Sequence, residues 1–406
     1  MAVPAAPPGL TAPPRSRGLA VLLTTLVALG PLSTDLYLPA LPTLARVFAS
    51  DAARVQLTLS VFLAGFACGQ IVYGPLSDRF GRRPAMLSGL AIYCAASLGC
   101  VFADSIEVLI LARFVQALGA CAGPVLGRAV VRDVWGATDS ARIIAYMGGA
   151  MAIAPLLGPT LGGFLTVLFG WQSNFVVLLL IGATQLIAVA RLLRESNVHR
   201  DAGATHPRQM ASTFLRLLAD RHYLGNVLTF SFSYSALFAF ISGSSFVLAE
   251  RHGLTPQVYG MCFGVVVAGY LFGSLASGRL VRRLGSVRLL ARGAWLGAIA
   301  GAGMWCLEVA GVHSIAALLG PMFLCTVATG LVMPNAIAGA LAAYPTLAGS
   351  ASALMGFVQM TLAALVGIAV GHGLAGGAGA LASAVAICTA LAPLSYLALI
   401  RVRRGP

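Results

Sequence analysis

Two charged residues lie inside stretches of apolar sequence, where a charge is costly and therefore usually functional. Asp35 is the only carboxylate well inside an apolar run, at 19–41, and Arg113 lies inside the run 107–127. If both runs cross a membrane, the two residues lie at similar depth, about 9 Å from the same face. Such a carboxylate can hold either a proton or a cationic or hydrogen-bonding molecule, provided that the effect of burial on its pKa outweighs that of Arg113 or that Arg113 moves away. A purely structural Asp35–Arg113 ion pair is the alternative.

The composition indicates which elements must position these residues. Of the 406 residues, 59% are apolar and only 9% are charged, whereas soluble domains carry about 25% charged residues. Twelve membrane spans would use about 240 residues and leave no room for a further soluble domain. We therefore predict an all-α membrane protein with twelve transmembrane helices in two six-helix halves. We expect no enzyme, because the sequence contains no nucleophile–histidine pair, phosphate loop or soluble output domain.

Apolar runs separated by polar breaks predict the individual spans. They lie at about 19–41, 55–76, 85–103, 107–127, 142–167, 174–193, 223–248, 258–280, 289–308, 314–343, 351–374 and 381–400. All 26 basic residues are arginine, and with both termini inside, 22 of them fall on the cytoplasmic side and 3 outside. This bias predicts that orientation for a multi-pass protein of the inner membrane.

The predicted spans divide the chain into five parts. These are a disordered cytoplasmic tail at 1–18, a six-helix bundle at 19–193, a cytoplasmic linker at 194–222, a second bundle at 223–400 and a cytoplasmic tail at 401–406. The net charge of +14 does not indicate nucleic acid, because no basic run interleaved with aromatic residues lies outside a span. The eight cysteines lie in apolar stretches without metal-ligand spacing. We therefore expect no disulfide, metal or cofactor.

The second half of the sequence repeats the first at an offset of 200 positions. Residues 69–83 (GQIVYGPLSDRFGRR) align with residues 269–283 (GYLFGSLASGRLVRR). The alignment repeats Ser77 as Ser277 and the arginine pair 82–83 as 282–283. Two homologous six-helix halves around a central site are the layout of secondary transporters.

Three motifs resemble the major facilitator superfamily. Gly74-Pro-Leu-Ser-Asp78-Arg79-Phe-Gly81-Arg82-Arg83-Pro84 matches its signature loop, and Ala154-Pro-Leu-Leu-Gly158-Pro159-Thr-Leu-Gly162-Gly163 resembles its fifth-helix antiporter motif. Ser33-Thr-Asp35-Leu-Tyr37-Leu-Pro39-Ala-Leu-Pro42 is similar to the twelve-span drug/proton antiporters, especially the bicyclomycin and chloramphenicol/florfenicol resistance branch. The sequence departs from the family pattern at Gly278, which replaces the acidic residue in the second signature loop, and in span 11, which lacks the Gly-Pro element.

The resemblance implies a proton-coupled antiporter that exports hydrophobic or amphipathic drugs such as these antibiotics. It acts across the bacterial inner membrane, as a monomer in the lipid bilayer and without a cofactor. Export of a natural metabolite, such as an amino acid or a nucleoside, is the alternative.

The resemblance also implies roles for two sets of motif residues. In the signature loop, Gly74, Asp78, Arg79, Gly81, Arg82 and Arg83 are expected to form a latch between the halves, and anchoring of the arginines to anionic headgroups is the alternative. In span 5, Gly158, Pro159, Gly162 and Gly163 predict a bent, closely packed helix at the interface between the halves. Generic close packing is the alternative there.

The candidate binding residues complete the hypothesis. Asp35 and Arg113 are assigned to proton coupling, with Gln116 placed to hydrogen-bond Arg113. In span 7, aromatic residues recur every four positions and form one face, which suits either a drug cavity or simple packing. The candidate substrate-binding residues are Asp35, Tyr37, Gln116, Phe230, Tyr234, Phe238, Asn335 and Gln359, with Gln70 as a further polar candidate.

Overall fold

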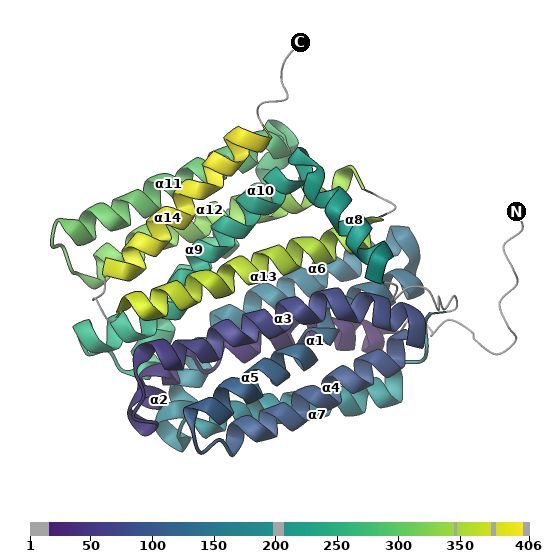
Figure 1. Cartoon of the computed structure of the whole chain (residues 1–406), viewed down its shortest axis with the longest axis horizontal. Helices are drawn as coiled ribbons and strands as arrows, with labels where there is room; N and C mark the ends of the chain where they lie inside the picture. The colour runs from purple at the N-terminus through teal and green to yellow at the C-terminus, as the bar shows by residue number, and fades with distance from the viewer. Residues whose placement is uncertain (1–15, 198–206, 345–346, 375–378, 401–406) are drawn as a thin grey trace, which may run out of the picture.

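The computed structural model describes residues 16–197, 207–344, 347–374 and 379–400, and within these ranges the chain is helical, without strands (Figure 1). The tail at 401–406 and most of the tail at 1–18 lie outside the described residues, as do residues 198–206 of the linker. The helices are α1 (Arg17–Asp35), η1 (Leu38–Ala40), α2 (Leu41–Val47), α3 (Ala52–Phe80), α4 (Arg82–Val101), α5 (Ile106–Ala120), α6 (Ala122–Phe169), α7 (Gln172–Leu192), α8 (Pro207–Ala219), α9 (Arg221–His252), α10 (Pro256–Leu284), α11 (Ser286–Val309), α12 (Ile315–Ala342), α13 (Ala348–Gly373) and α14 (Gly379–Leu399).

The helix ends follow from local sequence chemistry. The side chain of Asp51 accepts the backbone N–H of Arg54 at 2.7 Å and begins α3, and Ser314 accepts the N–H of Ala317 at 3.1 Å and begins α12. Such N-caps satisfy backbone donors that have no partner within the helix. α9 ends at Gly253, which adopts the left-handed conformation with φ +64°. Glycine takes that conformation without steric cost.

α6 is a single helical ribbon that folds back on itself. In a straight helix, Gly127 and Met147 would be about 30 Å apart, because each residue adds 1.5 Å. In the structure, however, a Cβ added at Gly127 would lie only 3.2 Å from the methyl carbon of Met147. The chain therefore crosses the bundle once in the first part of α6 and returns in the last part. This ribbon contains the end of predicted span 4 and all of span 5.

The structure has the twelve-helix architecture expected from the sequence. Ten helical stretches in the described residues are long and apolar enough to cross a membrane. They include Arg17–Val47, in which α1, η1 and α2 follow one another, and Ile106–Trp135, which runs from α5 into α6. The remaining two expected spans correspond to α11, with 24 residues, and to the returning part of α6, which contains the shorter apolar helix Ile153–Phe169.

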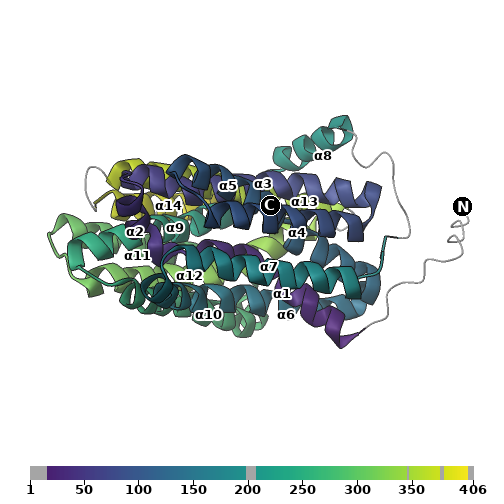
Figure 2. The same ribbon diagram turned by 90° about the horizontal axis from the view of Figure 1, so that it is seen from below.

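One helix, α8, lies in the segment that the sequence indicated only as a linker. It packs against α9 and α13, and Figure 2 shows it at the margin of the bundle. Leu217 is completely buried, whereas Leu215 on another side of the helix is exposed. α8 is an amphipathic helix of 13 residues without a continuous apolar run, so apolar runs in the sequence do not predict it.

The spanning helices form two groups that meet along two seams. In the first group, α1 packs on α6, α3 and α4 pack on α5, and α4 packs on α7. In the second group, α12 packs on α9, α10 and α11, and α14 packs on α9 and α11. The groups join where α13 lies beside α3 and where α10 lies beside α6 (Figure 1). Any site between the halves must lie near these seams.

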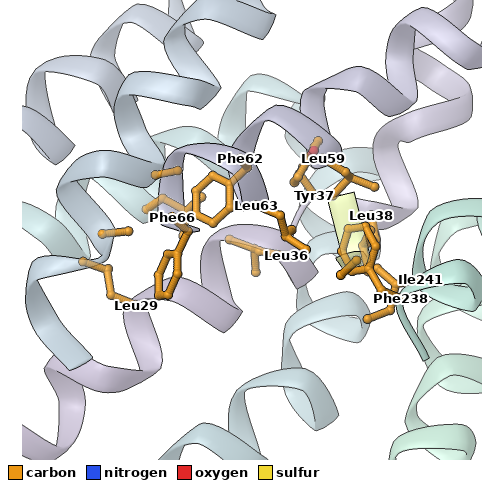
Figure 3. Packing of buried hydrophobic residues seen from close by; sticks show 14 of the residues in the cluster. Leu29, Leu36, Tyr37, Leu38, Leu59, Phe62, Leu63, Phe66, Phe238 and Ile241 are labelled. Atoms are coloured by element: carbon orange, nitrogen blue, oxygen red, sulfur yellow. The ribbon is translucent and has the colours of Figure 1, made fainter. Parts of the chain in front are cut away.

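The molecule is closed at the end that carries α2, which we call the α2 end. There η1 contacts both α9 and α10, and α2 contacts α9. Figure 3 shows Leu38 of η1 next to Phe238 and Ile241 of α9, and all three side chains are buried. Apolar side chains from the two halves therefore pack directly against each other at the α2 end.

Candidate functional site

Asp35 lies at a break in the first transmembrane segment. It is the last residue of α1, and the chain continues through the turn at Leu36 into η1. Pro39 and Pro42 follow, at the beginnings of η1 and α2, where a proline is tolerated because no helical N–H is lost. Asp35 is 3% exposed and accepts a hydrogen bond from Thr34 Oγ1 at 3.2 Å. The carboxylate thus lies at the negative end of the helix dipole, where a proton or a cationic group is favourable.

The glycines of the returning part of α6 allow this helix to touch the break. A Cβ at Gly158 would lie 3.2 Å from the Cβ of Asp35. A Cβ at Gly162 would lie 2.6 Å from the carbonyl carbon of Leu36 and closer still to its oxygen. Contacts between carbon atoms are favourable at about 3.5–4.0 Å, so only glycine fits at position 162.

The same motif also packs on α10 in the other half. A Cβ at Gly163 would lie 2.8 Å from the carbonyl carbon of Pro256, the first residue of α10. In the opposite direction, a Cβ at Gly260 would lie 2.5 Å from the carbonyl oxygen of Pro159. The motif Gly158–Gly163 is thus wedged between the α1 break and the start of α10. Its packing joins the two halves at the α2 end.

Arg113 lies in an aromatic cage inside the first half. It is completely buried, and its guanidinium carbon lies 4.4 Å from the ring centroid of Tyr37 and 4.2 Å from that of Phe62. Nη2 donates to the backbone oxygen of Ser33 at 2.9 Å, and Nη1 donates to Gln116 Oε1. Cation–π contacts and these neutral acceptors take the place of a counter-ion.

Asp35 and Arg113 do not form an ion pair. No carboxylate of the described residues lies within 4.0 Å of the guanidinium, and the contact of Arg113 with the α1 break is to the backbone of Ser33. The alternative of a static Asp35–Arg113 pair is therefore wrong for this conformation. Tyr37 and Gln116, which the sequence indicated as substrate-binding candidates, lie against Arg113, and Tyr37 is also buried and bonded to Thr58 Oγ1 at 3.0 Å.

Two tyrosines of the second half, Tyr234 in α9 and Tyr259 in α10, lie within electrostatic range of Asp35. For Tyr259 the packing supports this, because its neighbour Gly260 meets the carbonyl of Pro159, next to Gly158, which meets Asp35. Tyr270, also in α10, lies within range of Tyr234. The sequence analysis identified Tyr234 by its aromatic spacing but missed Tyr259 and Tyr270. No pattern within α10 distinguishes these two, and only the packing of α10 on α6 brings Tyr259 near the acid.

The other aromatic candidates of α9 lie elsewhere. Phe230 belongs to a buried cluster inside the second half that also contains Leu290 of α11. The ring of Phe238 lies against α13, where its Cε1 would be 2.9 Å from a Cβ at Gly367. The predicted aromatic face therefore does not line one cavity, because the helix buries these residues against different neighbours.

The polar candidates in α12 and α13 also differ in position. Asn335 Nδ2 donates to Ser277 Oγ at 2.8 Å, which joins α12 to α10 within the second half. Gln70 of α3 lies over Gly356 of α13, at the seam between the halves. Gln359 is buried, one turn further along α13. Gln70 and Gln359 are therefore close to the interface, whereas Asn335 is bonded within one half.

The signature loop at the other end of α3 is a compact charged cluster. Arg82 donates to Asp78 and, through Nε, to Asp133 of α6 at 3.2 Å. The guanidinium of Arg79 lies 5.1 Å from the ring centroid of Phe80, and Arg83 Nη2 donates to the backbone oxygen of Ala190 at 2.9 Å. Gly74, one turn before the loop, has no heavy atom within 4 Å of the position that a Cβ would take.

Glu195 organises this loop from the beginning of the linker. Its Oε1 accepts the backbone N–H of Arg82 at 2.8 Å and that of Asn197 at 2.9 Å, and its Oε2 accepts the N–H of Arg83 at 3.2 Å. The carboxylate occupies the space beside Gly81, which has φ +105°. The sequence analysis missed Glu195, since it lies more than a hundred positions from the loop. Within the described residues, the hydrogen bonds and ion pairs of Asp78 and Arg82 are to the first half and the linker.

A membrane protein whose two helical halves bury an acid between them has the architecture of a secondary transporter rather than of an enzyme. The chain belongs to the Major Facilitator Superfamily, which its residues 23–368 match. This confirms the resemblance indicated by the sequence motifs.

Three comparisons illustrate the relationship. The chain is 33% identical over 356 residues to the uncharacterized MFS-type transporter YdgK of Bacillus subtilis (strain 168), covering 87% of this chain and 88% of the relative. It is 27% identical over 387 residues to the bicyclomycin resistance protein homolog of Haemophilus influenzae, covering 93% and 94%. The crystal structure of a D-xylose–proton symporter superposes with a TM-score of 0.75 at 16% identity, covering 95% of this chain and 97% of the other, and shows the fold alone.

Proposed function

We propose that the protein is a proton-coupled antiporter that exports hydrophobic or amphipathic drugs, such as bicyclomycin- or chloramphenicol-like antibiotics, across the bacterial inner membrane. The observation that carries the proposal is the buried carboxylate of Asp35, which lies between the halves and forms no ion pair with any of the described residues. A buried charge in a membrane protein is costly and is retained where it has a function.

Coupling follows from competition for Asp35. When the site opens to the acidic side, a proton binds to the carboxylate and the cargo leaves. When it opens to the other side, the proton leaves and the carboxylate again accepts a cationic or hydrogen-bonding group of the cargo. Because Arg113 is held by Ser33, Gln116 and aromatic rings, it leaves the carboxylate free for both. Each proton moved inward supplies about 2.3 kcal/mol per 100 mV.

The proposal includes an orientation and a binding surface. The arginine bias places both termini and the signature loop in the cytoplasm, so the α2 end faces outward. The conformation described here is then closed to the outside. Tyr234 supplies an aromatic ring and a hydroxyl group near the acid, which suits a planar, partly polar cargo. We propose that a monomer carries out the whole cycle.

The test is transport of chloramphenicol by the purified protein in liposomes with an imposed pH gradient. We expect Asp35→Asn to abolish gradient-driven transport and to retain measurable chloramphenicol binding, because the amide keeps the shape of the site but cannot exchange a proton. Asp51→Asn is the matched control: this carboxylate is exposed and caps α3, and asparagine caps a helix equally well. Gradient-driven transport by the Asp35→Asn protein at the wild-type rate would contradict the proposal.

A further inference from the structure

Tyr259 lies between Asp35 and the outer surface. It is in the first turn of α10, which begins at Pro256 at the α2 end, and it is 3% exposed. Asp35 is deeper, because the chain still passes through η1 and α2 before it reaches that surface. Adjacent residues of α6 bring Asp35 and Tyr259 close together: a Cβ at Gly158 would lie 3.2 Å from the Cβ of Asp35, and a Cβ at Gly260, next to Tyr259, would lie 2.5 Å from the carbonyl oxygen of Pro159. The Tyr259 hydroxyl and Asp35 are not hydrogen-bonded to each other. The hydroxyl instead pairs with Ser244 Oγ of α9 at 3.2 Å.

The ring of Tyr259 belongs to a row of buried aromatic residues. Its centroid lies 6.1 Å from that of Phe263, which lies 6.2 Å from that of Phe240 in α9. All three side chains are buried. Such a layer of rings excludes water more effectively than small side chains do, because each ring removes a large apolar area from solvent.

The backbone around Tyr259 is fixed by the first half. Gly260 meets the carbonyl of Pro159, and Gly163 meets the carbonyl of Pro256, so α6 supports both sides of the first turn of α10. η1 also contacts α10. The backbone that carries Tyr259 can therefore move away from Asp35 only when the two halves separate at the outer end.

We propose that the ring of Tyr259 closes the outer route to Asp35 in this conformation and thereby prevents protons from leaking past the transport cycle. The inference rests on the proposed function, since it takes Asp35 as the proton-binding group. It assigns to Tyr259 a positioning role: the residue determines to which side Asp35 is accessible.

The experiment measures proton leak without substrate. Purified protein in liposomes with an imposed pH gradient and a potassium ionophore is followed with a pH-sensitive dye in the lumen. We expect Tyr259→Ala to accelerate the leak by roughly tenfold. Tyr259→Phe keeps the ring and is expected to remain close to wild type, and Tyr259→Leu, which keeps apolar bulk but no ring, is expected to lie between Phe and Ala.

Two further variants identify the route. Phe272→Ala removes an aromatic ring from the exposed side of the same helix, α10, and is expected to leave the leak unchanged. Combining Asp35→Asn with Tyr259→Ala or Tyr259→Leu is expected to return the leak to the wild-type rate, because the protons pass through Asp35.

Three results would overturn the inference. The first is a wild-type leak in both Tyr259→Ala and Tyr259→Leu, and the second is a leak in Phe272→Ala as large as that in Tyr259→Ala. The third is a leak in Tyr259→Phe as large as in Tyr259→Leu, which would assign the closure to the hydroxyl rather than the ring. Any of these results, obtained while Asp35→Asn still abolishes gradient-driven transport, would remove the role of Tyr259 and leave the proposed function intact. Gradient-driven transport in Asp35→Asn would instead remove the proposed function itself.

Discussion

Replacing Gly162 by alanine would place a methyl carbon 2.6 Å from the carbonyl carbon of Leu36 and 3.2 Å from Asn174 Oδ1. The carbonyl belongs to the backbone at the α1 break, so it cannot rotate away as the end of a flexible side chain can. To restore a normal carbon–carbon contact, α6 must move away from α1 by roughly 1 Å. That movement would also disturb the contacts of α6 with α10. Overpacking of this kind costs about 3 kcal/mol.

The assay is thermal unfolding of the detergent-solubilised protein, with transport measured at equal abundance in the membrane. We expect Gly162→Ala to lower the apparent melting temperature by roughly 5 °C or more. Two alanine substitutions form a graded control series. At Gly158 the added carbon would lie 3.2 Å from the Cβ of Asp35, so a small shift accommodates it. At Gly264 the nearest atom is the oxygen of Leu156 at 3.8 Å, an ordinary contact.

The order of the series is the critical result. Gly158→Ala is expected to be mildly destabilised, and Gly264→Ala is expected to match wild type or exceed it, because alanine favours a helix over glycine by about 1 kcal/mol. A Gly162→Ala protein as stable as Gly264→Ala would refute the conclusion that the span 5 motif exists to bring α6 against the α1 break.

Two further predictions concern carboxylates at the end of the molecule opposite the α2 end. Glu195→Gln is expected to destabilise the protein by about 2 kcal/mol, because the amide turns one hydrogen-bond acceptor into a donor that faces backbone N–H groups. Thermal unfolding in detergent measures this loss of stability. An unchanged melting temperature would show that the loop does not depend on this carboxylate. Burial alone would raise the pKa of Asp220, but hydrogen bonds from the Tyr344 hydroxyl and from the backbone N–H groups of His222 and Tyr223 hold it below its ordinary value of 3.8. Asp220→Ala is therefore expected to cost about 1 kcal/mol at neutral pH. The difference from wild type should shrink as the pH falls from about 4 through the lower pKa of the folded protein, because the carboxylate is then protonated and loses these hydrogen bonds; a difference that persists unchanged in acid would contradict the assignment.

The site could be predicted only in part. The isolation of Asp35 and Arg113 in apolar runs was sufficient to identify both as unusual, and the hydrogen bond from Arg113 to Gln116 follows from their spacing on one helix. The cage around Arg113 was not predictable, because Phe62 belongs to α3 and its rotation toward α5 depends on packing. The spacing in α9 likewise did not show that Tyr234 lies near the acid while Phe230, one turn away on the same face, packs in a cluster inside the second half.

The amino-acid sequence by itself determined the membrane environment, the number of crossings, the repeat of the two halves and the family. These properties follow from composition and from short local motifs, because a bilayer requires each crossing segment to be apolar along its own length. Only the tertiary structure decided which charges and rings meet: Arg113 bonds the backbone of Ser33 rather than Asp35, Tyr259 arrives from the other half, and Glu195 fills the space beside Gly81. Such contacts depend on how each helix is rotated and how the halves dock, and a run of apolar residues has no preferred rotation.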